Sequence, residues 1–330
     1  MNYFENPNFW ISAFSWHKSI FPKILSRVIL FVAFSFLVTF FFQLMHLNVE
    51  FDVGPFEISG TALGLLLVFR VNSGYERWWE GRKLWGAIMG HLRNLAISAI
   101  EYGPQNSQWK RDFFAWSIAL AYVGKKVLRP HFDLSELSKF LSTREIESLK
   151  GDRHYAGIVG QHLARLLYDA HQNHGMSGFI FMQLDKERLF LLEQIAACER
   201  ILKSPPPPIL EIKIRRFLVA FLVMVPFSLV DRLGWLSPLA MLMITYPLLA
   251  LDQIGIELQN PFSKKVLDHL PLNEFTQNIQ KELLLIIQDN LKCDTCLSSC
   301  TLFGHTIDND VCQKEIKVQP SFEFKLRQVH

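Results

Sequence analysis

Four apolar stretches stand out from a chain whose other segments mix polar and apolar positions. The first, residues 28–45, holds 18 residues without a charge. At a rise of about 1.5 Å per residue this length approaches the roughly 30 Å thickness of a hydrocarbon layer. A second stretch, 58–69, is shorter and contains two glycines, which is typical of a helix packed closely against other helices. The pattern predicts membrane-spanning helices at both places.

The third and fourth stretches lie much later, at 217–230 and 233–251, and only the polar pair Asp231-Arg232 separates them. They predict a helical hairpin, so that the chain would cross the membrane four times. Prolines interrupt both stretches. Neighbouring helices can satisfy the carbonyls that a proline frees inside a membrane, and the prediction of helices stands.

Charges beside the apolar stretches predict the orientation of the chain. Basic residues precede the first stretch and acidic residues follow it, which places the N-terminus on the cytoplasmic side. Basic residues also flank residues 72–212 at both ends, so we expect that region and the C-terminus to be cytoplasmic as well. The acidic residues that we place near the outer mouth of a pore are Glu50, Asp52 and Glu57.

The long middle region predicts soluble helices rather than further spans. Its most apolar run, 113–124, is about 12 residues long, too short for a membrane and typical of a buried helix. The proline run 204–208 cannot lie inside a helix and predicts the linker back to the membrane. The chain therefore divides into 1–71 with the first two membrane helices, 72–212, 213–251 with the last two, and a C-terminal region 252–330.

The second apolar stretch carries the most specific functional pattern. Thr61, Leu65 and Phe69 are spaced four residues apart, so in a helix they share one face. After Phe69 the sequence turns abruptly polar. A ring of such helices would form a hydrophobic neck that opens into a wet vestibule, and such a neck can gate ions by dewetting. Alternatively, the three residues are ordinary packing positions in a helical bundle.

Other chemistry is weakly indicated. The small net charge of +3 and the absence of a long basic run argue against nucleic acid, and no motif of an enzymatic site occurs. We expect no cofactor and no bound metal. The weak zinc candidates are Cys293, Cys296 and Cys300, which His305 or Cys312 could complete. Free thiols are the alternative interpretation.

Several segments resemble a known family of membrane proteins. The sequence VFRVNSGYERWWEGRKLWG at 68–86 is similar to the segment that follows the neck helix in bacterial bestrophin homologues. FSWHKSIFPKIL at 14–25, ACERILKSPPPP at 197–208 and ELQNPFSKKVLDHLPL at 257–272 agree in order and position. The resemblance covers most of the chain, without the cysteine-containing tail.

The resemblance implies an all-α membrane protein that assembles as a homopentamer around one axial pore, with a large helical cytoplasmic region. It also implies that the helix at about 56–71 lines the neck with Thr61, Leu65 and Phe69, where the family often has a bulkier residue than Thr61. It further implies a second, cytoplasmic constriction, for which Ile180 and Met182 are the candidates. Two lysines follow the Asn-Pro-Phe at 260–262, where eukaryotic members bind calcium, which argues against a calcium site here.

The sequence thus predicts a channel of the inner membrane that conducts small monovalent ions and contacts membrane lipid. The acidic outer mouth favours cations such as sodium, although animal members of the family favour chloride. A second hypothesis is an oligomeric membrane scaffold without conductance. A coupled carrier is a weaker third one, because the predicted spans contain few charges.

Overall fold

The computed structural model describes residues 19–45, 52, 54–150, 154–264, 266–267 and 269–294, and within these residues it contains helices and no strand. The prediction of an all-α protein is confirmed. The α-helices are α2 (Phe21–Leu44), α3 (Gly54–Tyr102), α4 (Ser107–Leu128), α5 (Thr143–Lys150), α6 (Tyr155–Asn173), α7 (Gly178–Lys203), α8 (Pro208–Leu233), α9 (Ser237–Glu257) and α10 (Leu272–Asp294). Two short 3-10 helices are η1 (Leu134–Lys139) and η2 (Gly234–Leu236).

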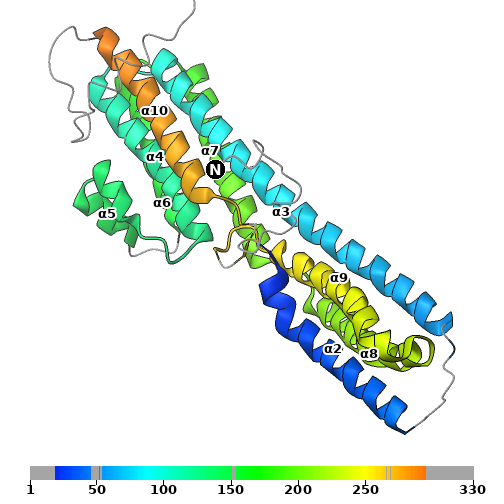
Figure 1. Ribbon diagram of the computed structural model, residues 1–330. Helices are drawn as coiled ribbons and strands as arrows, with labels where there is room; N and C mark the ends of the chain where they lie inside the picture. Colours follow the sequence, from blue (N-terminus) through cyan, green and yellow to red (C-terminus); the bar gives the residue numbers. More distant parts are fainter. Residues whose placement is uncertain are drawn as a thin grey trace, which may run out of the picture.

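The molecule is elongated and has two halves that share one helix (Figure 1). Helix α3 contains 49 residues and is therefore about 75 Å long. Its first part packs against α8 and α9, and its later part packs against α4, α7 and α10. The second apolar stretch of the sequence is thus the beginning of a much longer helix, which carries the chain from one half into the other without a break.

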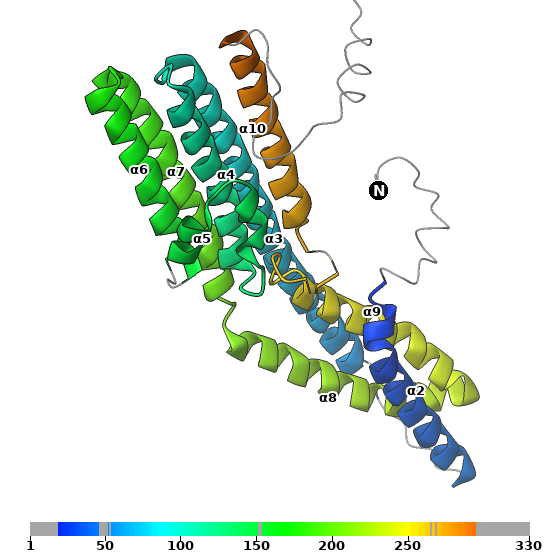
Figure 2. The ribbon, with the colours of Figure 1, turned by 90° about the vertical axis from the view of Figure 1, so that its left-hand side faces the viewer.

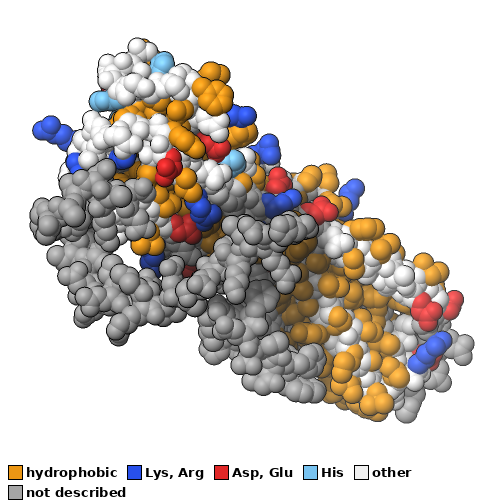
Figure 3. Space-filling model, turned by 90° about the horizontal axis from the view of Figure 1, so that it is seen from above, with side chains coloured by type: hydrophobic (Ala, Val, Ile, Leu, Met, Phe, Trp, Pro, Cys, Tyr) orange, Lys and Arg blue, Asp and Glu red, His pale blue; other side chains and the backbone are white. Residues whose placement is uncertain are grey.

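The apolar half consists of α2, α8, α9 and the start of α3. Its small core includes Ile24, Leu63, Leu67, Leu222 and Met241, which are 2% exposed or less. Large hydrophobic side chains also cover its outer surface, and Figure 3 shows them gathered over this half. Three stretches have the length and composition to cross a membrane, within α2, within α3, and from Pro208 to Glu257 across α8 and α9.

Helices α8 and α9 pack against each other on either side of η2, as the predicted hairpin requires. The turn differs in position from the expected one, because Asp231 and Arg232 still belong to α8. Gly234 ends that helix with a φ of 51°, a left-handed conformation that glycine adopts without the steric cost of a side chain. The chain therefore reverses at the glycine and not at the charged pair.

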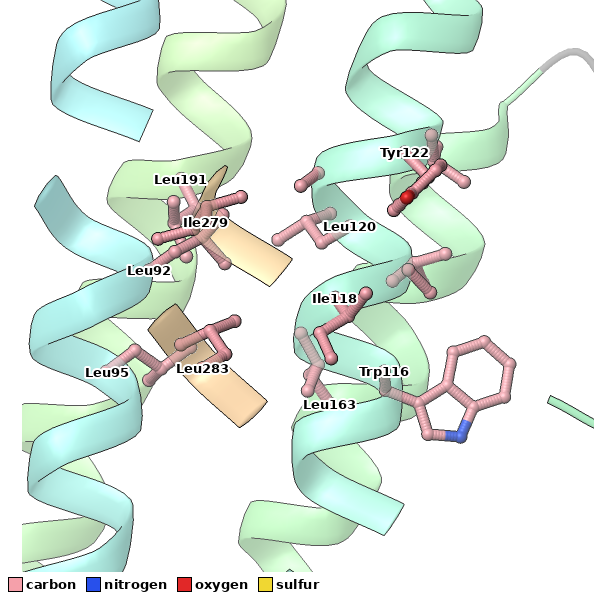
Figure 4. Packing of buried hydrophobic residues seen from close by; sticks show 14 of the residues in the cluster. Leu92, Leu95, Trp116, Ile118, Leu120, Tyr122, Leu163, Leu191, Ile279 and Leu283 are labelled. Atoms are coloured by element: carbon pink, nitrogen blue, oxygen red, sulfur yellow. The ribbon is translucent and has the colours of Figure 1, made fainter. Parts of the chain in front are cut away.

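The other half is a bundle of parallel and antiparallel helices formed by α4, α6, α7, α10 and the later part of α3 (Figure 2). Helix α4 lies in its centre, and Phe113, Leu120 and Val123 of α4 are completely buried. Figure 4 shows side chains of this core from α3, α4, α6, α7 and α10, among them Leu92, Leu163, Leu191 and Leu283. The prediction that 113–124 is a buried helix is confirmed.

Candidate ion-conduction pathway

One face of α3 in the apolar half is left uncovered by the rest of the chain. Leu65 and Phe69 are 56% and 60% exposed, and Thr61 is exposed in line with them. On the opposite face, Leu63 and Leu67 are completely buried against the core. The three residues that the sequence placed on one face of a helix therefore do lie on one face, which we call the α3 stripe.

The α3 stripe presents no free polar group toward its surroundings. The hydroxyl group of Thr61 donates a hydrogen bond of 2.8 Å to the carbonyl oxygen of Glu57, one turn earlier in the same helix. Such a bond satisfies the hydroxyl inside the helix. All three positions can therefore border a dry, apolar space, which is the property a hydrophobic constriction needs.

Buried ion pairs fix the rotation of α3 directly below Phe69. The guanidinium group of Arg70 donates a hydrogen bond to the carboxylate of Asp252 on α9, and both side chains are 5% exposed or less. Glu211 on α8 lies 3.3 Å from Arg70 and 2.8 Å from Arg215. Because a buried charge is costly without its partner, the pairs of Arg70 with Asp252 and Glu211 hold α3, α9 and α8 in one arrangement.

Close backbone approach supports the same arrangement. A side chain at Gly255 on α9 would lie 3.1 Å from Cγ of Arg70, and a side chain at Gly74 would lie 3.1 Å from the carbonyl oxygen of Gly255. Glycine at both positions lets α3 and α9 approach until Arg70 reaches Asp252. The neighbouring residues thus turn Arg70 inward and leave Phe69 on the open face.

Arg77 ties α3 to two helix ends. Its guanidinium group donates hydrogen bonds to the carbonyl oxygens of Ile201 and Ser204 at the end of α7, at 2.6 and 2.9 Å. It also donates one of 3.2 Å to the carbonyl oxygen of Gln259, just after α9. The last carbonyls of a helix lack partners within the helix. Arg77 therefore has a structural role.

The two candidates for a second constriction differ in environment. Ile180 packs partly buried against the core of the bundle, whereas Met182 is 70% exposed. Both belong to the first turns of α7, which runs along α3. Of the two side chains, Met182 has the open surroundings that a residue bordering a vestibule would need.

The acidic residues expected at the outer mouth gather at the start of α3. Asp52 is exposed and accepts a hydrogen bond of 3.1 Å from the backbone N–H of Gly54. Glu57 is exposed in the first turn of the helix. Both positions suit carboxylates because the N-terminus of a helix carries partial positive charge. Glu50 lies outside the described residues.

The weak zinc candidates cannot be placed, because the side chain of Cys293 and the residues Cys296, Cys300, His305 and Cys312 lie outside the described part of the chain. Within the described residues, no group of three or more His, Cys, Asp or Glu side chains is arranged to hold a metal ion. Cys198 is buried, and its burial raises the pKa of its thiol to about 12. That thiol is therefore unreactive at neutral pH.

The buried pair of Arg70 and Asp252 was not predicted from the sequence. Arg70 directly follows Phe69, where the sequence turns polar, and only the packing of the helices buries it. A signal was present, because Asp252 directly follows the fourth apolar stretch and Arg70 directly follows the second. Charges at the ends of apolar runs can pair with each other.

Comparison with known proteins identifies the family. The sequence model of the family described as "Bacterial/Fungal Bestrophin protein" matches residues 1–285. The chain belongs to the bestrophin family. It is 31% identical over 272 residues to the voltage-dependent anion channel-forming protein YneE of Escherichia coli (strain K12), covering 82% of this chain and 89% of that protein. It is 30% identical over 275 residues to the voltage-dependent anion channel-forming protein alr2987 of Nostoc sp., with the same two coverages.

Solved bestrophin structures share the fold. The structure of a variant of a bacterial bestrophin homologue from Klebsiella pneumoniae matches with a TM-score of 0.75 at 24% identity, over 80% of this chain and 98% of that chain. Another variant of that homologue matches with a TM-score of 0.76 over 81% of this chain. The chain therefore shares the fold of these structures over about four fifths of its length.

Proposed function

We propose that this chain is the subunit of a bestrophin-type ion channel that passes small monovalent ions passively through a hydrophobic neck formed by Thr61, Leu65 and Phe69. The observation that carries the proposal is the open α3 stripe, which the buried pairs of Arg70 hold facing away from the subunit. Both relatives of about 30% identity are named as channel-forming proteins. As a bestrophin, the chain is not an enzyme.

The proposed assembly is a homopentamer with one axial pore in the inner membrane, with both termini cytoplasmic. The uncovered stripe supports it, because a single copy leaves Leu65 and Phe69 exposed and copies arranged around an axis would bring these side chains together. The outer surface of α2 and α8 carries large exposed hydrophobic side chains, which suits contact with lipid. We also propose that α8 and α9 each cross the membrane, so that each subunit has four membrane-spanning helices.

Selectivity is proposed to lean toward cations. Asp52 and Glu57 stand at the start of α3, and repetition of these carboxylates around an axis would concentrate cations at the outer mouth. The relatives are named as anion channels, which points the other way. The charges belong to this chain itself, and we give them the greater weight.

The experiment measures current through planar bilayers that contain the purified protein, with unequal NaCl concentrations on the two sides. We expect a passive current whose reversal potential lies toward the sodium equilibrium potential. A reversal potential near that of chloride would reject the proposed cation preference but retain the channel.

Variants locate the neck in the same measurement. Leu65→Ala and Phe69→Ala should each raise the conductance severalfold, because a shorter side chain widens and wets the constriction. Leu37→Ala removes an equally exposed side chain from α2, where Leu37 is 64% exposed, and should leave the conductance unchanged. Equal effects of all three variants would contradict a neck at the α3 stripe.

The alternative is an oligomeric membrane scaffold whose centre does not conduct. The observation that favours it is the large helical bundle beside the apolar half, which offers a surface for partners. The current measurement distinguishes the two functions, because a scaffold would form intact oligomers that conduct no current at any voltage.

A further inference from the structure

The open face of α3 continues beyond the stripe into a line of charged residues. Helix α3 runs without interruption from Gly54 to Tyr102, so positions on one face can be projected along it. At about 100° per residue, Glu76 lies only about 20° around the helix axis from both Leu65 and Phe69. Lys83 follows Leu65 by five full turns of about 3.6 residues, and so lies directly below it. All four side chains belong to the exposed face.

Among the described residues, Glu76 has no partner that neutralises its charge. Its neighbours on α3 are engaged elsewhere: Arg77 donates to three backbone carbonyls, and Glu80 lies 3.8 Å from Arg200. Glu76 is exposed and forms no hydrogen bond or ion pair with any side chain that the structure describes. Its negative charge therefore acts on whatever occupies the space in front of the stripe.

Distance decides which charge on this line acts most strongly on the neck. Glu76 lies seven residues, or about 10 Å along the helix axis, beyond Phe69, and Lys83 lies about 21 Å beyond it. The Debye length is about 8 Å in physiological salt. The influence of Glu76 is therefore reduced moderately at the neck, whereas that of Lys83 is reduced much more.

We infer that Glu76 forms the charged ring at the inner end of the neck and sets the ratio of cation to anion permeability. This inference rests on the proposed channel, in which copies of the α3 stripe surround the pore, so that each copy contributes one carboxylate. Such a ring raises the local concentration of cations where they enter or leave the constriction and lowers that of anions. Lys83 forms a weaker, opposing ring farther into the vestibule.

The test compares Glu76→Gln with the unchanged protein in planar bilayers under a NaCl gradient. Removal of the ring should lower the permeability ratio of sodium to chloride by about three- to tenfold, whichever ion the unchanged channel prefers. Lys83→Gln should raise the ratio by a smaller factor. Because glutamine matches glutamate in size and Glu76 is exposed, we expect the assembly to be unaltered, and gel filtration of each variant checks this.

Glu147→Gln is the matched control. Glu147 is also exposed but belongs to the short helix α5, which packs against η1, so the same loss of charge should leave the ratio unchanged. If Glu76→Gln leaves the ratio unchanged while Phe69→Ala alters the conductance, the inference is wrong and the channel stands. If Glu147→Gln shifts the ratio as much as Glu76→Gln, the effect comes from net charge and the inference is also wrong. If the unchanged protein conducts no current, both the inference about Glu76 and the proposed channel are wrong.

Discussion

Two buried cations in the bundle are stabilised in different ways. Arg129 donates hydrogen bonds of 2.8 Å to the carbonyl oxygens of Phe262 and Leu270, and so joins α4 to the segment that follows α9. Lys125 is 2% exposed, and its ammonium group lies 3.5 Å from the ring centroid of Phe132. Burial lowers the pKa of Lys125 to about 8, although the nearby Glu136 acts to raise it. A guanidinium group can serve two carbonyls at once, whereas this ammonium group is held mainly against an aromatic face.

The pKa of Lys125 predicts a pH-dependent effect on stability. A pKa lowered to about 8 in the folded state means that the unfolded chain binds the proton more tightly. The charged ammonium group therefore opposes folding below about pH 8, and this cost disappears as the pH rises toward its ordinary pKa of about 10.4. Lys125→Met should raise the melting temperature at pH 7, and the gain should shrink by pH 10. Thermal unfolding in detergent at both pH values measures it.

The adjacent Lys126 supplies the control for this measurement. Its ammonium group donates hydrogen bonds of 2.7 and 2.6 Å to the carbonyl oxygens of Pro130 and Phe132. Lys126→Met should therefore lower the melting temperature at pH 7. A gain for Lys125→Met that is as large at pH 10 as at pH 7 would show that burial of the charge is not its cause.

At the scale of the elements, α3 depends on glycine where it crosses the chain after α9. A side chain at Gly81 would lie 3.1 Å from Cγ of Pro261 and 3.2 Å from Cζ of Phe262, and both of these rings are stiff. A side chain at Gly90, about two and a half turns later, would meet nothing within 4 Å. Gly81 is therefore required for close packing, whereas the space beside Gly90 could hold a side chain.

The two glycines predict opposite effects of the same substitution. Gly90→Ala should stabilise the protein by up to about 1 kcal/mol, because alanine favours the helix over glycine by that amount. Gly81→Ala gains the same helix propensity, but the new methyl group must displace the rings of Pro261 and Phe262. Such overpacking costs about 1–3 kcal/mol. We therefore expect a net loss, measured as a lower melting temperature in detergent. A loss at Gly90 as well would indicate that another subunit covers that position.

At the scale of the whole molecule, the two halves have different surfaces. The apolar half exposes large hydrophobic side chains such as Phe36, Leu37 and Met243, and the bundle encloses most of its own. The turn between α8 and α9 stands at the far tip of the apolar half, where Trp235 is 58% exposed (Figure 1). If the apolar half crosses the membrane, this turn and the bundle lie on opposite sides of it.

Labelling of single cysteines tests that arrangement. We expect Trp235→Cys to react with a membrane-impermeant maleimide added outside intact cells, and Ser148→Cys on α5 to react only after permeabilisation. The native Cys198 is buried, and the other native cysteines are replaced by serine to provide a silent background. Reaction of Ser148→Cys in intact cells would place the bundle outside and reverse the proposed orientation.

Much of this molecule follows from local properties of its sequence. The number of consecutive uncharged residues was enough to distinguish the long run 28–45, which forms most of α2, from the short run 113–124, which is buried in α4. Helical periodicity alone placed Thr61, Leu65 and Phe69 on one face. The helices and the shared face could be predicted because hydrophobicity, length and periodicity act over neighbouring residues. That the run 28–45 crosses a membrane stays a prediction. The role of the stripe as a neck stays a prediction.

Contacts between distant residues were decided only by the tertiary structure. The pair of Arg70 and Asp252 joins positions 182 apart in the chain, and Arg77 donates to carbonyls at the end of α7 and just after α9. The sequence could not distinguish Ile180 from Met182, because a difference of two residues turns a helical side chain by about 200° and only the neighbouring helices show which direction is buried. The helices follow from local physics, and their rotation, which decides whether a residue faces the core or the outside, follows from long-range packing.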